Sequence, residues 1–494
     1  MTAFNKLVEH SKTISHFNHL AAICGWDQAS MMPSGGNQAR SEAMAQLSVH
    51  IHGLLTQPQL SDWFAQAEAE TLSAQDNASL RELKRQWMQA NVLPESLVQA
   101  KSLAGSKCEH AWRSQRGDND WKGFETNWAE VVKLSQEEAQ IRAEATGLSP
   151  YDSMLDIYEP GTTSASLDVL FADVKTWLPS LIDDVIEKQK SEAFITPVGQ
   201  FDTTQQKALG LDVMKLLQFD FEHGRLDESV HPFCGGVPSD VRITTRYDES
   251  EFVQSLMGIV HETGHARYEQ GLPKVLGGLP AGEARSMGIH ESQSLFFEMQ
   301  VGRSDSFIQH LSSLAGKQFT THDPALFGFD NFQKLYTRVK KDFIRVDADE
   351  LTYPAHVILR YEIERDLING KIKHTDVPEL WNQKMQQYLG LKTEGNFKNG
   401  CMQDIHWTDG AFGYFPSYTL GAMYAAQFMA SMKQTVDVDS AIHSGDLTPI
   451  FNWLGENIWS KGSLLTTDEL VKQATGETLN ADFFKSHLVE RYLG

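Results

Sequence analysis

The sequence predicts a mainly α-helical protein, one large helical body with a single small β element. From residue 1 to about 230, apolar side chains recur at intervals of three and four, the spacing of helices with one buried face. Breaks in this pattern are few, and no low-complexity linker or internal repeat divides the chain. Only Asp240–Tyr247 shows the period-two alternation of a strand.

Three segments of the first half carry the helical pattern most clearly: Leu80–Asn91, Trp121–Ala145 and Ser166–Lys190. Between the second and the third, Glu159–Thr163 reads Glu-Pro-Gly-Thr-Thr, which is typical of a turn into the next helix. This half of the chain is therefore expected to be helical scaffold.

The predicted strand, Asp240–Tyr247, has one apolar face and one cationic, hydroxyl-bearing face. Its edge is a candidate for pairing with an extended peptide, although a small structural hairpin explains the pattern equally well. Directly after it, Asp248 and Glu251 resemble a capping box that opens a helix. This helix is expected to end near Gly271, with Pro273 just beyond.

The net charge limits the possible partners of the protein, and the cysteines limit its possible compartment. The chain has 43 Lys and Arg residues against 65 Asp and Glu, a formal net charge of −22, which argues against nucleic acids and anionic membranes. The four cysteines are scattered without CxxC spacing, as expected in a reducing compartment. No apolar run is long enough to span a bilayer, and the N-terminus lacks a signal-peptide pattern, so we expect a cytoplasmic protein.

The helix after the strand contains the motif His261-Glu-Thr-Gly-His265. Residues four apart lie on one helical face, so His261 and His265 can direct their imidazoles at one metal ion. Glu262 is then placed to hold a metal-activated water and to act as general base. A bound metal ion lowers the pKa of water to about 7, which provides a nucleophile at neutral pH. A motif this short also occurs by chance, in helices whose histidines face water.

A second carboxylate-bearing segment, Gly288–Ser294, follows a glycine-rich turn. The turn lets the chain reverse, so that a second helix can pack on the first and offer Glu291 as a third protein ligand. Two histidines, one glutamate and an open position are the arrangement of a catalytic rather than a structural zinc site. His290 is the rival ligand, but its neighbouring position is expected to make it face elsewhere on the helix.

The segments HETGH and GIHESQSLFFE resemble the carboxypeptidase Taq family of zinc metallocarboxypeptidases. No ligand position departs from the family pattern. Further matching segments extend the resemblance over nearly the whole chain: Trp26–Gln28 before Met32-Pro33, Tyr158–Gly161, His231–Phe233, Asp240–Thr244, Arg360–Glu362, Gln403–Trp407 and Gly413–Tyr418.

This resemblance implies one metallocarboxypeptidase domain over residues 1–494, split by a deep groove with the metal at its floor. Within it we expect a helical scaffold and groove wall in 1–230, the catalytic region in 231–420 and C-terminal helices in 421–494. The family also implies a homodimer that removes single residues from peptides with a free C-terminus. Side-chain tolerance is expected to be broad, with poor tolerance of proline near the scissile bond.

An enzyme of this kind must bind a terminal carboxylate, for which the arginine guanidinium is the best side chain. The resemblance favours Arg360 as this clamp, and an ion pair with Glu362 or Glu364 is the alternative. Arg242, on the polar face of the predicted strand, is the second choice, unless it pairs with Asp240.

Transition-state hydrogen-bond donors are expected from Gln403–Tyr418, whose glycines and aromatic residues favour a groove-lining loop over a regular helix. His406 and Tyr418 are the preferred donors. Tyr414 and His231 are further candidates for substrate contacts, and aromatic packing or a structural histidine is the alternative explanation for each.

One Zn²⁺ per chain is the expected cofactor, and Co²⁺ or Mn²⁺ are possible substitutes in such a site. Two other functions stay open. An oligopeptidase or dipeptidyl carboxypeptidase uses the same metal ligands, and an inactive peptide-binding scaffold would keep only the groove. The intact metal motif argues against the scaffold.

Overall fold

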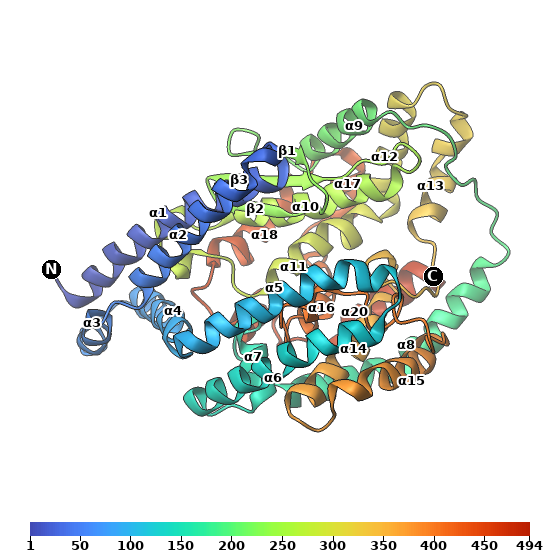
Figure 1. The fold of residues 1–494 in the computed structure, drawn as a ribbon. Coiled ribbons are helices and arrows are strands. Elements are labelled where there is room, and N and C mark those ends of the chain that lie inside the picture. Colours follow the sequence, from blue (N-terminus) through green and yellow to red (C-terminus); the bar gives the residue numbers. More distant parts are fainter.

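The computed structural model describes residues 1–494 and is mainly helical, as the sequence predicts (Figure 1). The strands are β1 (Gly224–Glu228), β2 (Cys234–Val237) and β3 (Asp240–Thr245). The helices are α1 (Ala3–Ser30), α2 (Asn37–Leu55), α3 (Gln59–Ala67), α4 (Ala74–Asn91), α5 (Glu95–Gly117), α6 (Trp121–Thr146), α7 (Pro150–Tyr158), α8 (Ser164–Gln189), α9 (Thr203–Leu216), α10 (Val253–Gly271), α11 (Met287–Leu295), α12 (Asp305–Gln318), α13 (Phe329–Tyr336), α14 (Tyr353–Ile368), α15 (Val377–Leu389), α16 (Pro416–Met432), α17 (Val438–Ser444), α18 (Thr448–Asn457), α19 (Thr467–Thr475) and α20 (Ala481–Leu493).

The three helices predicted most clearly are confirmed as α4, α6 and α8. The turn expected at Glu159–Thr163 lies between α7 and α8, and Thr163 caps α8 through a hydrogen bond from the Ser166 amide. No helix is both long and apolar enough to cross a membrane.

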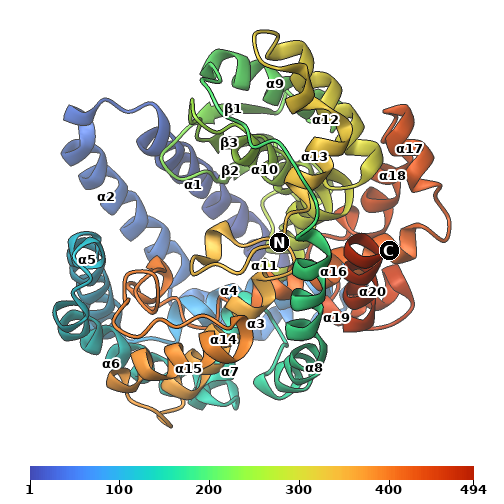
Figure 2. The ribbon, with the colours of Figure 1, turned by 90° about the vertical axis from the view of Figure 1, so that its right-hand side faces the viewer.

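The apolar core is continuous over most of the chain. Its main cluster of 86 buried residues runs from Cys108 to Tyr492, whereas a separate cluster of eight unites α1, α3 and α4. Helix α16 crosses the boundary expected at residue 420, so the fold has no break there. The three-part division of one domain stays a prediction. In Figure 2, α17, α18 and α20 lie on the opposite side of the molecule from α2 and α5.

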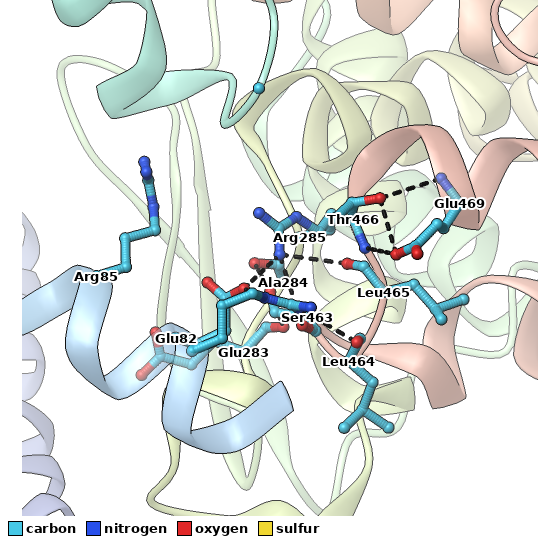
Figure 3. Close-up of polar contacts among 12 residues, drawn as sticks. Glu82, Arg85, Glu283, Ala284, Arg285, Ser463, Leu464, Leu465, Thr466 and Glu469 are labelled. Atoms are coloured by element: carbon cyan, nitrogen blue, oxygen red, sulfur yellow. Dashed lines mark hydrogen bonds and ion pairs between the residues drawn. The ribbon is translucent and has the colours of Figure 1, made fainter. Parts of the chain in front are cut away.

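A buried ion pair attaches the N-terminal helices to this body (Figure 3). Arg285, just before α11, donates from Nη1 to Glu82 of α4 at 2.9 Å, and the two side chains are 3% and 9% exposed. The same nitrogen reaches the carbonyl of Leu465 at 3.2 Å, and Arg81 donates to the carbonyl of Ser463 at 2.9 Å. Helix α4, the segment before α11 and the loop before α19 are therefore held together.

The small sheet has the order β1-β3-β2. Strand β3 pairs in parallel with β1 and antiparallel with β2, so both of its edges are occupied. The prediction that a peptide pairs with this strand is therefore wrong, and the structural hairpin is the correct alternative. Val241 and Ile243 of β3 pack with Ile259 and Ala266 of α10, which places the sheet against the motif helix.

Helix α10 begins at Val253 and ends at Gly271, as predicted at its C-terminus. The capping box expected from Asp248 and Glu251 does not form. Glu251 instead accepts a hydrogen bond from the Val253 amide at 2.7 Å, while Asp248 accepts one from the Ser250 amide. The N-cap position is Phe252 rather than Asp248, because the helix begins only at Val253.

Candidate metal centre and groove

The three predicted metal ligands converge on one point. His261 and His265 lie one turn apart on α10, and Glu291 reaches them from α11. One ligand atom from each of the three lies within 4.8 Å of the others, close enough for a single ion. The structure thus brings together the donor set expected from the sequence.

Two glycines allow this convergence. A Cβ at Gly264, inside the motif, would lie 2.6 Å from the carbonyl oxygen of Gln293, so only glycine lets α11 come this close to α10. A Cβ at Gly421 of α16 would lie 2.7 Å from Cγ of Glu291. Contacts this short exceed what a packed core tolerates without backbone shifts. Helices α10 and α16 therefore hold Glu291 from two sides.

A buried carboxylate orients the first histidine. Nδ1 of His261 lies 2.8 Å from Glu298, which also accepts a hydrogen bond from Arg303 at 2.7 Å. Glu298 lies in a π-helical segment, Phe296–Gly302, that continues α11. With its hydrogen on Nδ1, His261 offers the lone pair of Nε2 to the centre.

Glu262 is 9% exposed and lies at the same centre. Burial raises the pKa of its carboxyl to about 7, against a lowering effect of His261 that is larger than the further raising effect of Glu291. Its Oε2 is buried without a hydrogen-bond partner. A buried acid with no partner and a pKa near neutrality fits a group that takes up and releases a proton.

Two cavities meet at the ligands and form one groove. The larger, of about 1140 Å³, lies between α1, the β2–β3 turn and the residues after α10, and Glu262 lines it. The second, of about 880 Å³, extends toward α14 and the segment before it. His265, Glu291 and Tyr414 line both, so the metal centre is at their junction.

His290 contacts a metal ligand without joining the ligand set. Its Nδ1 lies 2.6 Å from Nδ1 of His265, but it is not among the three residues that converge on one point. It does not replace Glu291, because it contacts the nitrogen of His265 that faces away from that carboxylate. Nε2 of His265 is the atom near Glu291, at 3.4 Å.

The expectation that Arg360 clamps a substrate carboxylate needs correction. Its side chain is 0% exposed, is paired with Asp404 at 2.6 Å and lies over the ring of Trp381. It lines neither cavity of the groove. A guanidinium enclosed in this way has a structural role. The weighed alternatives, Glu362 and Glu364, are not its partners either.

Three arginines line the smaller cavity, Arg303, Arg338 and Arg345, and the sequence analysis missed Arg345 as a candidate clamp. Its Nε donates to Asp404 at 2.9 Å and its Nη1 to the hydroxyl of Tyr353 at 2.6 Å, while Nη2 has no protein partner. Arg345 lines the smaller cavity, and its guanidinium lies 4.9 Å from the ring centre of Tyr418. Asp404 bridges both arginines, so Arg360 holds Arg345 from behind.

Of the expected hydrogen-bond donors, Tyr418 and Tyr414 line the groove. His406 lies behind them, with Nε2 at 3.1 Å from the Tyr418 hydroxyl. Burial lowers the pKa of His406 to about 4, so the ring is neutral. Its Nδ1 is buried without a partner. Burying an acceptor nitrogen without a partner costs less free energy than burying an N–H without one, so the ring hydrogen of His406 belongs on Nε2. Nε2 then donates to the Tyr418 oxygen, and the hydroxyl hydrogen of Tyr418 stays available to a group in the groove.

The two remaining candidates lie outside the groove. Arg242 pairs with both oxygens of Asp240, at 2.8 and 2.9 Å, and lies over Trp26. This is the alternative that the sequence left open. His231 is exposed, and its carbonyl accepts a hydrogen bond from Ser229. Neither side chain lines the two cavities, so the expected substrate contacts are corrected for both.

Two histidines of one helix, a glutamate of the next and a buried acid beside them are the site of a helical metallopeptidase. Comparison with known proteins agrees with this class. The family model of the carboxypeptidase Taq (M32) metallopeptidases matches residues 6–492. Carboxypeptidase 1 of Bacillus subtilis (strain 168) is 36% identical over 97% of this chain and 96% of its own length. Thermostable carboxypeptidase 1 of Thermus thermophilus is 35% identical, over 99% and 98%.

Solved structures show the same fold. Metallocarboxypeptidase 1 of Trypanosoma cruzi superposes with a TM-score of 0.97 at 45% identity, covering 100% of this chain and 99% of that one. A Pyrococcus furiosus carboxypeptidase gives a TM-score of 0.94 at 30% identity, with coverage of 100% and 99%.

The chain belongs to the carboxypeptidase Taq (M32) family of metallopeptidases. It is a metallocarboxypeptidase, a peptide hydrolase that acts on C-terminal residues, and the family implies a divalent metal. The His-His-Glu set described above fits such an ion.

Proposed function

We propose that the protein is a zinc carboxypeptidase of broad side-chain tolerance, with Glu262 as its general base. The donor set supports zinc, because two imidazoles and one carboxylate leave a fourth position open. His261, His265 and Glu291 would hold the zinc ion, which would supply a water of lowered pKa and polarisation of the scissile carbonyl. Cobalt or manganese are possible substitutes.

The protein's own groups account for the remaining steps. Glu262 accepts a proton from the attacking water and later donates it to the leaving amine, which its pKa of about 7 supports. The Tyr418 hydroxyl donates to the carbonyl oxygen as negative charge develops there. His406 positions that hydroxyl from behind.

Arg345 is the proposed clamp for the terminal carboxylate. The observation that carries the proposal is its unpaired Nη2, in a cavity of about 880 Å³ that also contains the three metal ligands. A carboxylate held there by charge-assisted hydrogen bonds leaves the rest of that cavity for the last side chain. The size of the cavity supports broad tolerance.

The test is a peptide ladder incubated with chelated and zinc-restored protein and read by mass spectrometry. We expect single C-terminal residues to be released only after zinc is restored, and release to stop when the C-terminus is amidated. Release of dipeptides, or continued cleavage of the amide, would support an oligopeptidase instead.

A homodimer and a cytoplasmic location are also proposed. The family resemblance supports the dimer, and four cysteines without a disulfide support a reducing compartment. Sedimentation velocity on the zinc-loaded protein checks the first, and a single monomer peak would contradict it.

A further inference from the structure

We propose that His290 and Glu269 form a hydrogen-bonded relay that determines which nitrogen of His265 is available to the metal. The inference rests on the proposed metal site and adds two positioning residues to it. His290 is the residue next to the ligand Glu291, and Glu269 follows His265 by one further helical turn on α10.

The relay is a chain of two short contacts. Nδ1 of His265 lies 2.6 Å from Nδ1 of His290, and Nε2 of His290 lies 2.8 Å from Oε1 of Glu269. The rings of His265 and His290 have centroids 4.6 Å apart. His290 is the only hydrogen-bond partner of Nδ1 of His265.

The position of each ring hydrogen determines which group donates and which accepts in this relay. A histidine that binds a metal through Nε2 must carry its hydrogen on Nδ1, and that hydrogen needs an acceptor. Nδ1 of His290 accepts it only if the hydrogen of His290 is on Nε2. Glu269, an acceptor at 2.8 Å, stabilises that tautomer. The carboxylate therefore acts on the metal ligand through an intervening imidazole.

The two histidine ligands are thus held differently. His261 is held directly by Glu298, which Arg303 anchors, and both of these side chains are about 15% exposed. His265 is held through His290 by Glu269, and these two line the larger cavity of the groove. Their side chains are 22% and 23% exposed. The relay consequently ends in the larger cavity, whereas Glu298 and Arg303 line the smaller one.

The test compares two substitutions of His290 by zinc affinity, measured by competition with a chromogenic chelator. H290F keeps a ring beside Tyr268 but has no acceptor for His265. H290Q keeps an oxygen that accepts from His265 and an amide that donates to Glu269. We expect H290F to raise the zinc Kd about 10- to 100-fold and H290Q to restore most of that loss. H443F, at an exposed histidine of α17, is the matched control and should leave the Kd unchanged.

Spectroscopy provides a second readout. In the Co²⁺-substituted protein, H290F and E269L should shift the visible absorption of the ion, and the control should not. Equal zinc affinity of H290F and wild type, with unshifted Co²⁺ spectra, would overturn the relay. Wild-type protein that binds no zinc would instead overturn the proposed function. Circular dichroism of the metal-free variants shows whether H290F has a folding defect. If it has, the test rests on the other two variants: H290Q should bind zinc within about threefold of wild type, and E269L should bind it more weakly than that.

Discussion

Replacing Arg345 by glutamine tests the assignment of the carboxylate clamp. Two of the three guanidinium nitrogens are already used, Nε by Asp404 and Nη1 by Tyr353, so a substrate carboxylate binds through Nη2. One hydrogen bond between charged groups contributes about 1.5–3 kcal/mol. At 1.36 kcal/mol per tenfold change in rate, R345Q should lower kcat/KM about 10- to 150-fold.

The assay is kcat/KM for one peptide as the free acid and as the C-terminal amide. R345Q should lose rate on the acid, because the charge that binds its carboxylate is removed. The amide, which offers no such charge, should not be cleaved by either protein. Lys340 lines the same cavity but is 72% exposed and paired with Asp342, so K340Q is the matched control and should change kcat/KM less than about threefold. A similar loss in both variants, or R345Q with more than a third of wild-type activity on the acid, would refute the reasoning.

Three further predictions concern residues around the site. G421A places a Cβ at 2.7 Å from Cγ of Glu291, so zinc should bind more weakly in chelator competition while the helical content by circular dichroism is retained; unchanged zinc affinity would contradict the packing argument. Y418F removes a proposed oxyanion donor and should lower kcat about 100-fold or more, with KM little changed; a change in KM alone would contradict that role. Burial raises the pKa of Glu159 from 4.5 to about 7, so the free energy of unfolding should fall by about 3 kcal/mol as the pH rises through that interval. E159Q should lack this part of the pH dependence in urea unfolding between pH 4 and 8, and an identical dependence would contradict it.

Local patterns predicted the helices and the ligands because both depend on short-range spacing. The period of three and four located α6 and α8 within about two residues, and α4 at its C-terminal end. The HETGH spacing located two ligands, and a glycine-rich reversal was enough to bring Glu291 to them.

The clamp could not be predicted, because its identity depends on burial rather than on local sequence. Arg360 and Arg345 share the carboxylate of Asp404, yet only Arg345 reaches the groove. Trp381, whose ring covers the guanidinium of Arg360, belongs to a different helix, α15. The family resemblance favoured the arginine in a recognisable motif, whereas Arg345 lies in a short irregular segment without a periodic signal.

The sheet was misjudged for a related reason. Strands β1 and β2 are short, and β2 reads Cys-Gly-Gly-Val, which carries no strand pattern. Their pairing with β3 is a tertiary contact that no local alternation records. The same holds for Gly264 and Gly421, whose missing side chains matter only because another helix lies against them. Glu269 did have a signal, since it continues the four-residue spacing of His261 and His265.

The most direct test of the account is a paired measurement of zinc content and turnover for wild type and E262Q. Glu262 is assigned to proton transfer and not to metal binding. Both proteins should therefore bind one zinc ion per chain, while E262Q loses about 10²- to 10⁴-fold in kcat. Wild-type activity in E262Q, or loss of zinc together with activity, would contradict the assignment of the general base.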